Sequence, residues 1–232
     1  MTSSGKITFV SSIFRDLVAV SPKFPKPGET IMGGDFFMGF GGKGANQCVM
    51  AAKLGAEAAI VGKVGDDEHG NAYTENLQQV KLTVTCRVTC SILHYLKVGV
   101  DTKYLGVESG ISTGIATIFV ESSSGENMIV IVPGANSRVT PEDVMKAETE
   151  IKKSGAVVAT LELGMDAVKK GMELGRKHGA TTILNAAPAR ADYGRDILEN
   201  VDILVVNETE AELLAGTDDL DKCGQKLREV CR

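Results

Sequence analysis

The chain has 232 residues, of which 43% are hydrophobic and 24% are charged, and its net charge is −5 at pH 7. These values are typical of one globular domain with a substantial core. The acidic balance, with no polybasic run in the sequence, argues against a nucleic acid partner, which requires a basic face. No apolar run reaches the ~18 residues of a membrane span, and the first residues lack the pattern of a secretory signal, so no membrane partner is expected.

Five cysteines are scattered along the sequence without the CxxC spacing of a zinc site or a redox motif. An odd number of isolated thiols is typical of a reducing compartment. We therefore expect a cytoplasmic protein, of a size that would also allow it to enter the nucleus. The cysteines are Cys48, Cys86, Cys90, Cys223 and Cys231.

Short β-branched runs alternate with amphipathic helical stretches along most of the chain. The predicted strands cover residues 7–10, 58–63, 114–121, 128–132, 156–161, 181–185 and 203–206. The predicted helices cover residues 44–54, 70–79, 141–153, 165–178 and 208–215. Strands separated by helix-length crossovers pair in parallel, so we expect a three-layer α/β/α domain with a mostly parallel central sheet.

Two regions break this alternation, because residues 30–40 and 114–132 resemble strands without intervening helices. A polar turn at residues 122–127 joins two apolar runs, which predicts a hairpin. We expect a small antiparallel lid sheet with strands within residues 17–40 and 112–134. The alternative is that these strands extend the edges of the main sheet.

Residues 81–97 fit neither pattern. The segment is β-branched and follows a helix that is already complete. Val80-Lys81 and Lys97-Val98 nearly mirror each other, as if Gln79 once continued directly into the residues after Lys97. We therefore hypothesise that residues 81–97 are an insertion.

The strongest local signal is the glycine-rich run at residues 39–47, directly before a predicted helix. Such a run lets the backbone approach a ligand, and the helix N-terminus supplies free N–H donors. It is not a phosphate-binding P-loop, because Phe37 and Gly44 stand where that motif needs glycine and a hydroxyl residue. We interpret it as a cradle for a polar ligand, with Lys43 and Asn46 as side-chain donors. The alternative is a tight structural turn.

The run Gly41-Gly42-Lys43-Gly44-Ala45-Asn46-Gln47 resembles the first signature of the ribokinase family of sugar and nucleoside kinases. Further matching segments lie at residues 25–30, 65–67, 112–114, 133–136, 161–162, 185–189 and 207–212. The resemblance implies a ribokinase-like fold and an enzyme that uses ATP to phosphorylate D-ribose at its terminal hydroxyl, giving ribose 5-phosphate. It also implies Mg²⁺ and, in the whole family member, a monovalent cation such as K⁺.

The resemblance assigns sugar binding to a small set of residues. Asp16 is expected at the end of the first strand region, where its carboxylate would accept two sugar hydroxyls; a solvated loop acid is the alternative. Glu162 would face the sugar, with an ordinary acid at a helix N-terminus as its alternative. Ser11 and Phe14 depart from the family pattern of glycine and asparagine at these positions. The implied sugar-binding residues are Asp16, Gly42, Lys43, Gly44, Asn46 and Glu162.

A second set is implied to serve the nucleotide. Asn185 and Asn207 would lie near the phosphates, and Asn207 and Glu210 form an Asn-x-x-Glu motif that would organise Mg²⁺ and its waters. The alternative for this pair is a capping box at a helix N-terminus. Both roles are compatible.

The family's Gly-Ala-Gly-Asp segment, which would carry the catalytic aspartate, does not occur in these 232 residues. We therefore expect one domain over residues 1–232 that is incomplete at its C-terminus, with no catalytic residue of its own and no activity alone. The alternatives are a non-catalytic sugar-binding or dimerising isoform and a kinase for another sugar or a nucleoside. The resemblance also implies a homodimer through the lid.

Overall fold

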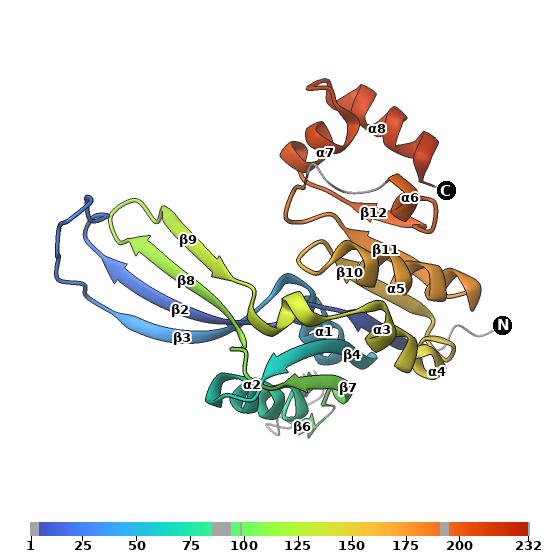
Figure 1. The fold of residues 1–232 in the computed structure, drawn as a ribbon, viewed down its shortest axis with the longest axis horizontal. Coiled ribbons are helices and arrows are strands. Elements are labelled where there is room, and N and C mark those ends of the chain that lie inside the picture. The colour runs from blue at the N-terminus through green and yellow to red at the C-terminus, as the bar shows by residue number, and fades with distance from the viewer. Residues whose placement is uncertain (1–4, 85–93, 98, 191–194, 232) are drawn as a thin grey trace, which may run out of the picture.

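The computed structural model describes residues 5–84, 94–97, 99–190 and 195–231. A six-stranded central sheet carries helices on both faces, and a four-stranded lid projects from one end of it (Figure 1). All pairs in the central sheet are parallel, as the βα alternation predicts. In spatial order its strands are β12 (Ile203–Val205), β11 (Thr181–Asn185), β10 (Ala156–Thr160), β1 (Lys6–Val10), β4 (Glu57–Gly65) and β7 (Asp101–Glu108).

The helices divide between two buried cores, one on each face of the central sheet. One face is covered by α1 (Lys43–Lys53) and α2 (Glu68–Gln78). Neighbouring residues of one strand serve opposite cores, as with Phe9 and Val10, because strand side chains alternate between faces. The other face is covered by α3 (Pro141–Lys146), α4 (Glu148–Ile151), α5 (Met165–Lys177), α6 (Arg195–Leu198), α7 (Glu208–Ala215) and α8 (Leu220–Val230).

The lid is a separate sheet, as predicted, with the order β3-β2-β8-β9. Its outer pairs, β2–β3 and β8–β9, are antiparallel, whereas the central pair β2–β8 is parallel, so the expectation of a purely antiparallel lid is wrong in that pair. The strands are β3 (Phe36–Gly41), β2 (Phe14–Ser21), β8 (Gly114–Glu121) and β9 (Asn127–Val132).

The first lid strand begins earlier than the sequence predicts. β2 starts at Phe14 and β3 ends at Gly41, so both extend beyond residues 17–40, and residues 30–35 form no strand. Asp16 therefore lies inside β2 of the lid and not at the end of the first strand region. The reason is that the chain leaves the central sheet after Val10 and, after three intervening residues, pairs with β3 and β8.

Several other elements differ from the sequence prediction. The helix expected over 141–153 is divided into α3 and α4 at Ala147. β7, α6 and α8 were not predicted, because β7 lacks a continuous apolar run, α6 is a single short turn, and α8 is rich in charged residues around a central glycine.

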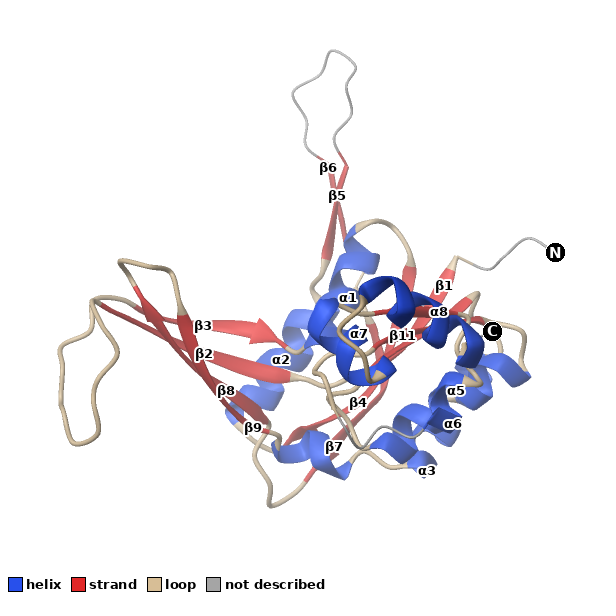
Figure 2. Cartoon of the chain, turned by 90° about the horizontal axis from the view of Figure 1, so that it is seen from above, coloured by secondary structure: helices blue, strands red, loops and turns tan. Residues whose placement is uncertain are grey.

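Residues of the hypothesised insertion form a ribbon outside both sheets. β5 (Lys81–Val84) and β6 (His94–Lys97) pair antiparallel, and residues 85–93 lie outside the described part of the chain. The ribbon and the lid project from the body in different directions (Figure 2). Gly99 N donates to Val80 O at 3.0 Å, so the two ends of the ribbon meet at its base.

The connection from the lid back to the body is held by buried polar contacts. After β9, the 3₁₀ turn η1 (Gly134–Arg138) places Asn136 so that its side chain accepts from Ile13 N at 2.8 Å and donates to Ile13 O at 2.7 Å. The connection into the lid at Ile13 and the connection out of it at Asn136 are thus joined to each other.

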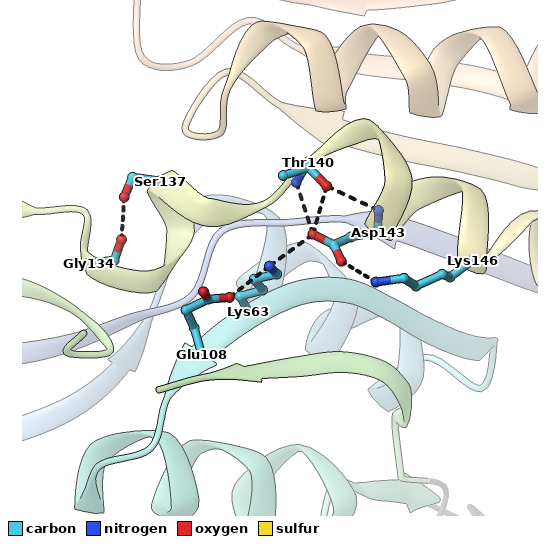
Figure 3. A network of polar contacts seen from close by, with 7 residues as sticks. All are labelled: Lys63, Glu108, Gly134, Ser137, Thr140, Asp143 and Lys146. Atoms are coloured by element: carbon cyan, nitrogen blue, oxygen red, sulfur yellow. Dashed lines mark hydrogen bonds and ion pairs between the residues drawn. The ribbon is translucent and has the colours of Figure 1, made fainter. Parts of the chain in front are cut away.

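Asp143, at the start of α3, forms the centre of a second polar network (Figure 3). It completes a capping box with Thr140 and forms ion pairs with Lys63 of β4 at 3.1 Å and with Lys146 at 2.9 Å. Lys63 also pairs with Glu108 of β7 at 2.8 Å. The network therefore joins α3 to two strands of the central sheet.

Candidate functional site

A pocket of about 180 Å³ lies where the lid meets the body. Its volume is below the ~300–1,000 Å³ of drug-sized ligand sites, so it suits a small molecule. Both the lid and the carboxyl edge of the central sheet contribute to its wall. The lining residues are Phe14, Asp16, Gly42, Lys43, Asn46, Ala116, Ile118, Ile129, Ile131 and Glu162.

The glycine turn before α1 brings backbone close to the pocket in a way that side chains would prevent. Gly42 has φ of 98°, and a Cβ on it would lie 2.6 Å from Ser12 O. A Cβ on Gly41 would lie 2.3 Å from Oδ1 of Asp16. The turn therefore packs directly against both the end of the body segment and the carboxylate of the lid.

Asp16 stands at the centre of this junction. It faces Gly39 across β2–β3 and Ala116 across β2–β8, so its side chain shares a face with the other pocket residues of the lid. The pKa of its carboxyl is raised, first by burial and then by the Glu162 carboxylate, while the positive charges of Arg15 and Lys43 oppose the rise.

Glu162 follows β10 and is held from three sides. One of its carboxylate oxygens, Oε2, accepts a short hydrogen bond from the Ser12 hydroxyl and another from Lys43 N at 2.8 Å. The other, Oε1, lies 3.5 Å from the ammonium of Lys43. Its side chain is only 6% exposed, so this carboxylate is a fixed charge in the pocket wall.

Lys43 and Asn46 lie in the first turn of α1, where backbone N–H groups point toward the N-terminal end. Both side chains line the pocket. Gly44 is not among the lining residues; it is buried where a Cβ would lie 2.5 Å from the Ser11 hydroxyl, so it permits close packing of α1 on the end of β1.

One wall of the pocket is apolar. Ala116, Ile118, Ile129 and Ile131 lie on the same face of the lid as Asp16, because β8 and β9 pair Ala116 with Ile131 and Ile118 with Ile129. Phe14 adds an aromatic ring and is buried. The pocket therefore combines hydrogen-bonding groups on one side with a surface for C–H groups on the other, which matches a polyol ring.

Sequence reasoning missed this apolar wall and the supporting roles of Ser12 and Asn136. The sequence shows the alternation of isoleucines in the predicted hairpin. Only the tertiary structure determines which face of the hairpin meets the glycine turn.

The residues expected near a nucleotide lie elsewhere on the carboxyl edge of the central sheet. Asn185 ends β11, and its Oδ1 accepts from Ala187 N at 3.1 Å. Asn207 and Glu210 form a capping box on α7, with Glu210 Oε2 accepting from Asn207 N at 2.9 Å and Asn207 Oδ1 accepting from Glu210 N at 2.8 Å. None of the three lines the pocket.

The donor set of this second region is compatible with Mg²⁺. In the described part of the chain, no three or more His, Cys, Asp or Glu side chains are grouped as a metal site. Mg²⁺ needs no such group, since it keeps several waters and binds one or two carboxylates together with phosphate oxygens. The capping box occupies Glu210 Oε2 with one backbone donor, and a carboxylate has further acceptor positions.

Among the described residues, no helix is both long and apolar enough to cross a membrane.

Comparison with known proteins gives consistent relatives. Mouse ribokinase is 40% identical over 210 residues, which cover 90% of this chain and 59% of that protein. A deoxyribokinase from Salmonella typhimurium is 36% identical over 210 residues, which cover 62% of that protein. The chain thus spans about three fifths of the length of these relatives.

Solved structures agree with the sequence comparison. Ribokinase from Giardia lamblia superposes with a TM-score of 0.80 at 30% identity, over 97% of this chain and 67% of that one. Arabidopsis thaliana ribokinase, solved with ribose and ATP, gives 0.77 at 26% identity, over 99% of this chain and 69% of that one. Both confirm the predicted α/β fold with a parallel central sheet and a second, small sheet.

The model of the pfkB family carbohydrate kinases matches residues 4–89 and 92–231, which is nearly the whole chain. The match includes the glycine turn and the strands that form the pocket. With this agreement in sequence and fold, the chain belongs to the pfkB family of carbohydrate kinases.

Proposed function

We propose that the chain binds D-ribose in the pocket under the lid, and that this site serves ATP-dependent transfer of a phosphoryl group to the terminal hydroxyl of the sugar. The observation that carries the proposal is the convergence of Asp16, Lys43 and Glu162 on one pocket of about 180 Å³ with an apolar opposite wall. The ribose and ATP named in the Arabidopsis complex support the same substrates.

Each polar group has a role in this proposal. The ionised Asp16 accepts two sugar hydroxyls, and hydrogen bonds to a charged acceptor are about twice as strong as those between neutral groups. Lys43 and Asn46 donate to sugar oxygens. Glu162 fixes Lys43 and the start of α1, and its remaining acceptor capacity faces the sugar.

The nucleotide is assigned to the neighbouring strand ends. Asn185 and Asn207 would contact phosphate oxygens, and Glu210 with Asn207 would hold Mg²⁺ through its waters, which neutralises charge on the phosphates. We also propose that the whole protein uses a monovalent cation such as K⁺. We further propose that the protein is located in the cytoplasm.

A second substrate is favoured by one specific observation. Phe14 contributes an aromatic wall where the family pattern has asparagine, so one polar contact to the sugar is replaced by an apolar one. A sugar that lacks one hydroxyl loses least in such a site, because no buried partner is left unpaired. The similarity to a deoxyribokinase makes 2-deoxy-D-ribose the alternative substrate to test.

Calorimetric titration of the chain with D-ribose, 2-deoxy-D-ribose and D-fructose tests the proposal. We expect one of the two pentoses to bind and fructose to bind at least tenfold more weakly. Asp16→Asn should weaken pentose binding by about 10- to 100-fold, because the charge-assisted hydrogen bonds are lost. The exposed Asp218→Asn is the matched control and should leave binding unchanged.

A chain that binds none of these sugars, or that binds them equally well after Asp16→Asn, would contradict the assignment. Titration with Mg-ATP separates the two functional classes that the sequence leaves open. Binding of nucleotide and phosphorylated pentose in a coupled assay supports a kinase. Sugar binding without nucleotide binding supports a non-catalytic, sugar-binding or dimerising role.

The partner in this proposal is a second copy of the chain. The lid is one sheet thick, and large apolar side chains are exposed on both of its faces, such as Phe37 on the pocket face and Val130 on the opposite one. Exposed apolar patches of this kind mark interaction sites. Two lids packed face to face would cover this surface, so we propose a homodimer through the lid.

A further inference from the structure

Arg15 is a buried cation without a buried anion beside it. The residue is 9% exposed, and within the described residues its Nε and Nη1 atoms have no hydrogen-bond partner. No carboxylate of the described residues lies within 4.0 Å of its guanidinium. Removing a guanidinium from water without a partner is strongly unfavourable, so this charge must be compensated in another way.

Part of the compensation comes from an outer-face cluster, formed by Arg15, Phe40 and Tyr73. The guanidinium lies 4.2 Å from the centroid of the Phe40 ring, directly across β2–β3. Phe40 meets Tyr73 edge to face at 5.1 Å, and the Tyr73 hydroxyl donates to Gly41 O at 2.5 Å. A cation–π contact offsets only part of the cost of burying a charge.

The rest of the compensation comes from the charges of the pocket. Two carboxylates lie there, the half-buried Asp16 and the buried Glu162, and Lys43 is already engaged with Glu162 through both its ammonium and its backbone N–H. Arg15 is therefore the cation near Asp16 that is not shared with Glu162. The two residues are adjacent on β2, so their side chains lie on opposite faces of the lid.

This arrangement differs from an ion pair in one useful respect. A direct ion pair would occupy the carboxylate oxygens of Asp16, which the sugar needs. A cation on the opposite face favours the ionised carboxylate and leaves both oxygens free to accept hydroxyls. The outer-face cluster also holds the carbonyl of Gly41, whose Cα lies against that same carboxylate.

We propose that Arg15 is a positioning residue of the sugar site, which keeps Asp16 ionised from the opposite face of β2 and, through Phe40 and Tyr73, holds Gly41 against it. The role of Asp16 in this inference rests on the proposed function.

The other charged and titratable groups that face Asp16 are Lys43 of α1, Tyr73 of α2 and Glu162 after β10. Burial and Glu162 raise the pKa of Asp16, whereas Arg15 and Lys43 lower it. Tyr73 stays a neutral donor because burial raises its pKa. Loss of Arg15 would leave Lys43 as the opposing cation among these groups, and Lys43 is shared with Glu162.

The direct test is an NMR titration of the Asp16 carboxyl carbon in the free protein, with the resonance identified by Asp16→Asn. Arg15→Met removes the charge, Arg15→Lys keeps it, and Lys170→Met removes a cation from α5 as the matched control. We expect the midpoint of Asp16 to rise by about 1 pH unit in Arg15→Met. It should stay within about 0.3 units in Arg15→Lys and Lys170→Met. Arg15→Gln repeats the neutral substitution if the methionine variant does not fold.

A second readout follows pentose affinity from pH 4.5 to 8. Because more Asp16 is protonated in Arg15→Met at low pH, its affinity should fall up to about tenfold below that of the unsubstituted chain there, and the two should converge at pH 8. An unshifted Asp16 midpoint in Arg15→Met overturns the inference, including the case in which affinity drops equally at every pH. A shifted midpoint in a chain that binds no pentose supports the role of Arg15 and contradicts the sugar-binding function instead.

Discussion

At the scale of single residues, the pocket depends on the close approach of backbone to a carboxylate. Gly39 pairs with Asp16 across β2–β3 and Gly41 pairs with Phe14, and both glycines lie close to the Asp16 side chain, but with different clearance. A Cβ on Gly41 would lie 2.3 Å from Oδ1 of Asp16, whereas one on Gly39 would lie 3.5 Å from the Asp16 Cβ, which is ordinary contact. The first position therefore excludes any side chain while Asp16 keeps its place, and the second does not.

This difference predicts the behaviour of two alanine variants. Gly41→Ala should displace the Asp16 carboxylate and weaken pentose binding by about 10- to 100-fold, since the charge-assisted hydrogen bonds lose their geometry. Gly39→Ala, two residues away on the same strand, should stay within about threefold of the unsubstituted chain. Calorimetric titration measures the pentose affinity of both variants, and circular dichroism checks that both variants fold. Equal losses in the two variants would mean that a side chain at either glycine impairs binding and that clearance at Asp16 is not the cause.

At the scale of elements, the start of α3 is fixed to the central sheet by the Asp143 network. Burial alone would raise the pKa of Asp143, but hydrogen bonds from Lys146, from Thr140 N and from Lys63 outweigh it and lower the pKa to about 2. A group whose folded-state pKa is depressed contributes stability above its unfolded-state value, and this contribution is lost as the pH falls through the folded-state value.

Asp143→Asn should therefore lower the free energy of unfolding by about 1 kcal/mol at pH 6, allowing for screening of a partly exposed group. The difference between this variant and the unsubstituted chain should shrink as the pH falls from about 4 to 2, because the carboxyl becomes protonated in both states. Urea unfolding followed by circular dichroism at several pH values measures it, with Asp218→Asn as the control. A difference that stays constant down to pH 2 would show that the ionised carboxylate is not what stabilises α3.

The β5–β6 ribbon gives a second prediction at this scale. Gly99 N donates to Val80 O at 3.0 Å and Val100 N to Leu77 O at 2.9 Å, so the chain on either side of residues 81–97 is already joined. Deletion of 81–97 leaves one residue, Val98, to span the gap. We expect the shortened chain to keep its melting temperature within a few degrees and to keep its pentose affinity. A large fall in either, measured by calorimetry, would reject the insertion hypothesis.

At the scale of the whole molecule, the lid extends from the body as a single layer. Every residue of β9 is exposed, and apolar side chains remain exposed on both faces of the lid, such as Phe37 and Val130. The proposed dimer would bury one of these faces. Because strand side chains alternate, the two faces can be tested separately.

Phe37→Glu places a charge on the pocket face, where Phe37 pairs with Val18, and Val130→Glu places one on the opposite face. We expect one of the two variants to sediment as a monomer, since a buried unpaired carboxylate opposes association. Leu54→Glu, an exposed apolar position at the end of α1, is the control and should not change the mass. Dimers in both lid variants would exclude the lid as the interface.

The opposite end of the molecule carries the edge strand β12. Within the described residues it pairs only with β11, and Ile203 and Val205 are 47% and 48% exposed. An uncovered apolar edge strand is a site where another strand can pair.

The amino-acid sequence by itself determined most of the architecture. The alternation of β-branched runs and amphipathic stretches predicted the parallel sheet, and Thr140 and Asn207 lie at helix N-termini because their side chains accept from backbone N–H groups three residues later. These are local effects, so they are readable from neighbouring residues. The motif of the glycine turn and the polar residues near it also followed from sequence, although their roles at the site remain predictions.

The tertiary structure decided which of these groups meet. Asp16 belongs to the lid because the chain crosses after Val10, and only pairing with β3 places Gly41 against its carboxylate. The apolar wall of Ile129 and Ile131 and the buried charge of Arg15 likewise depend on which face of a strand turns inward. Strand register and burial are set by contacts between distant segments, and a shift of one residue would exchange the two faces.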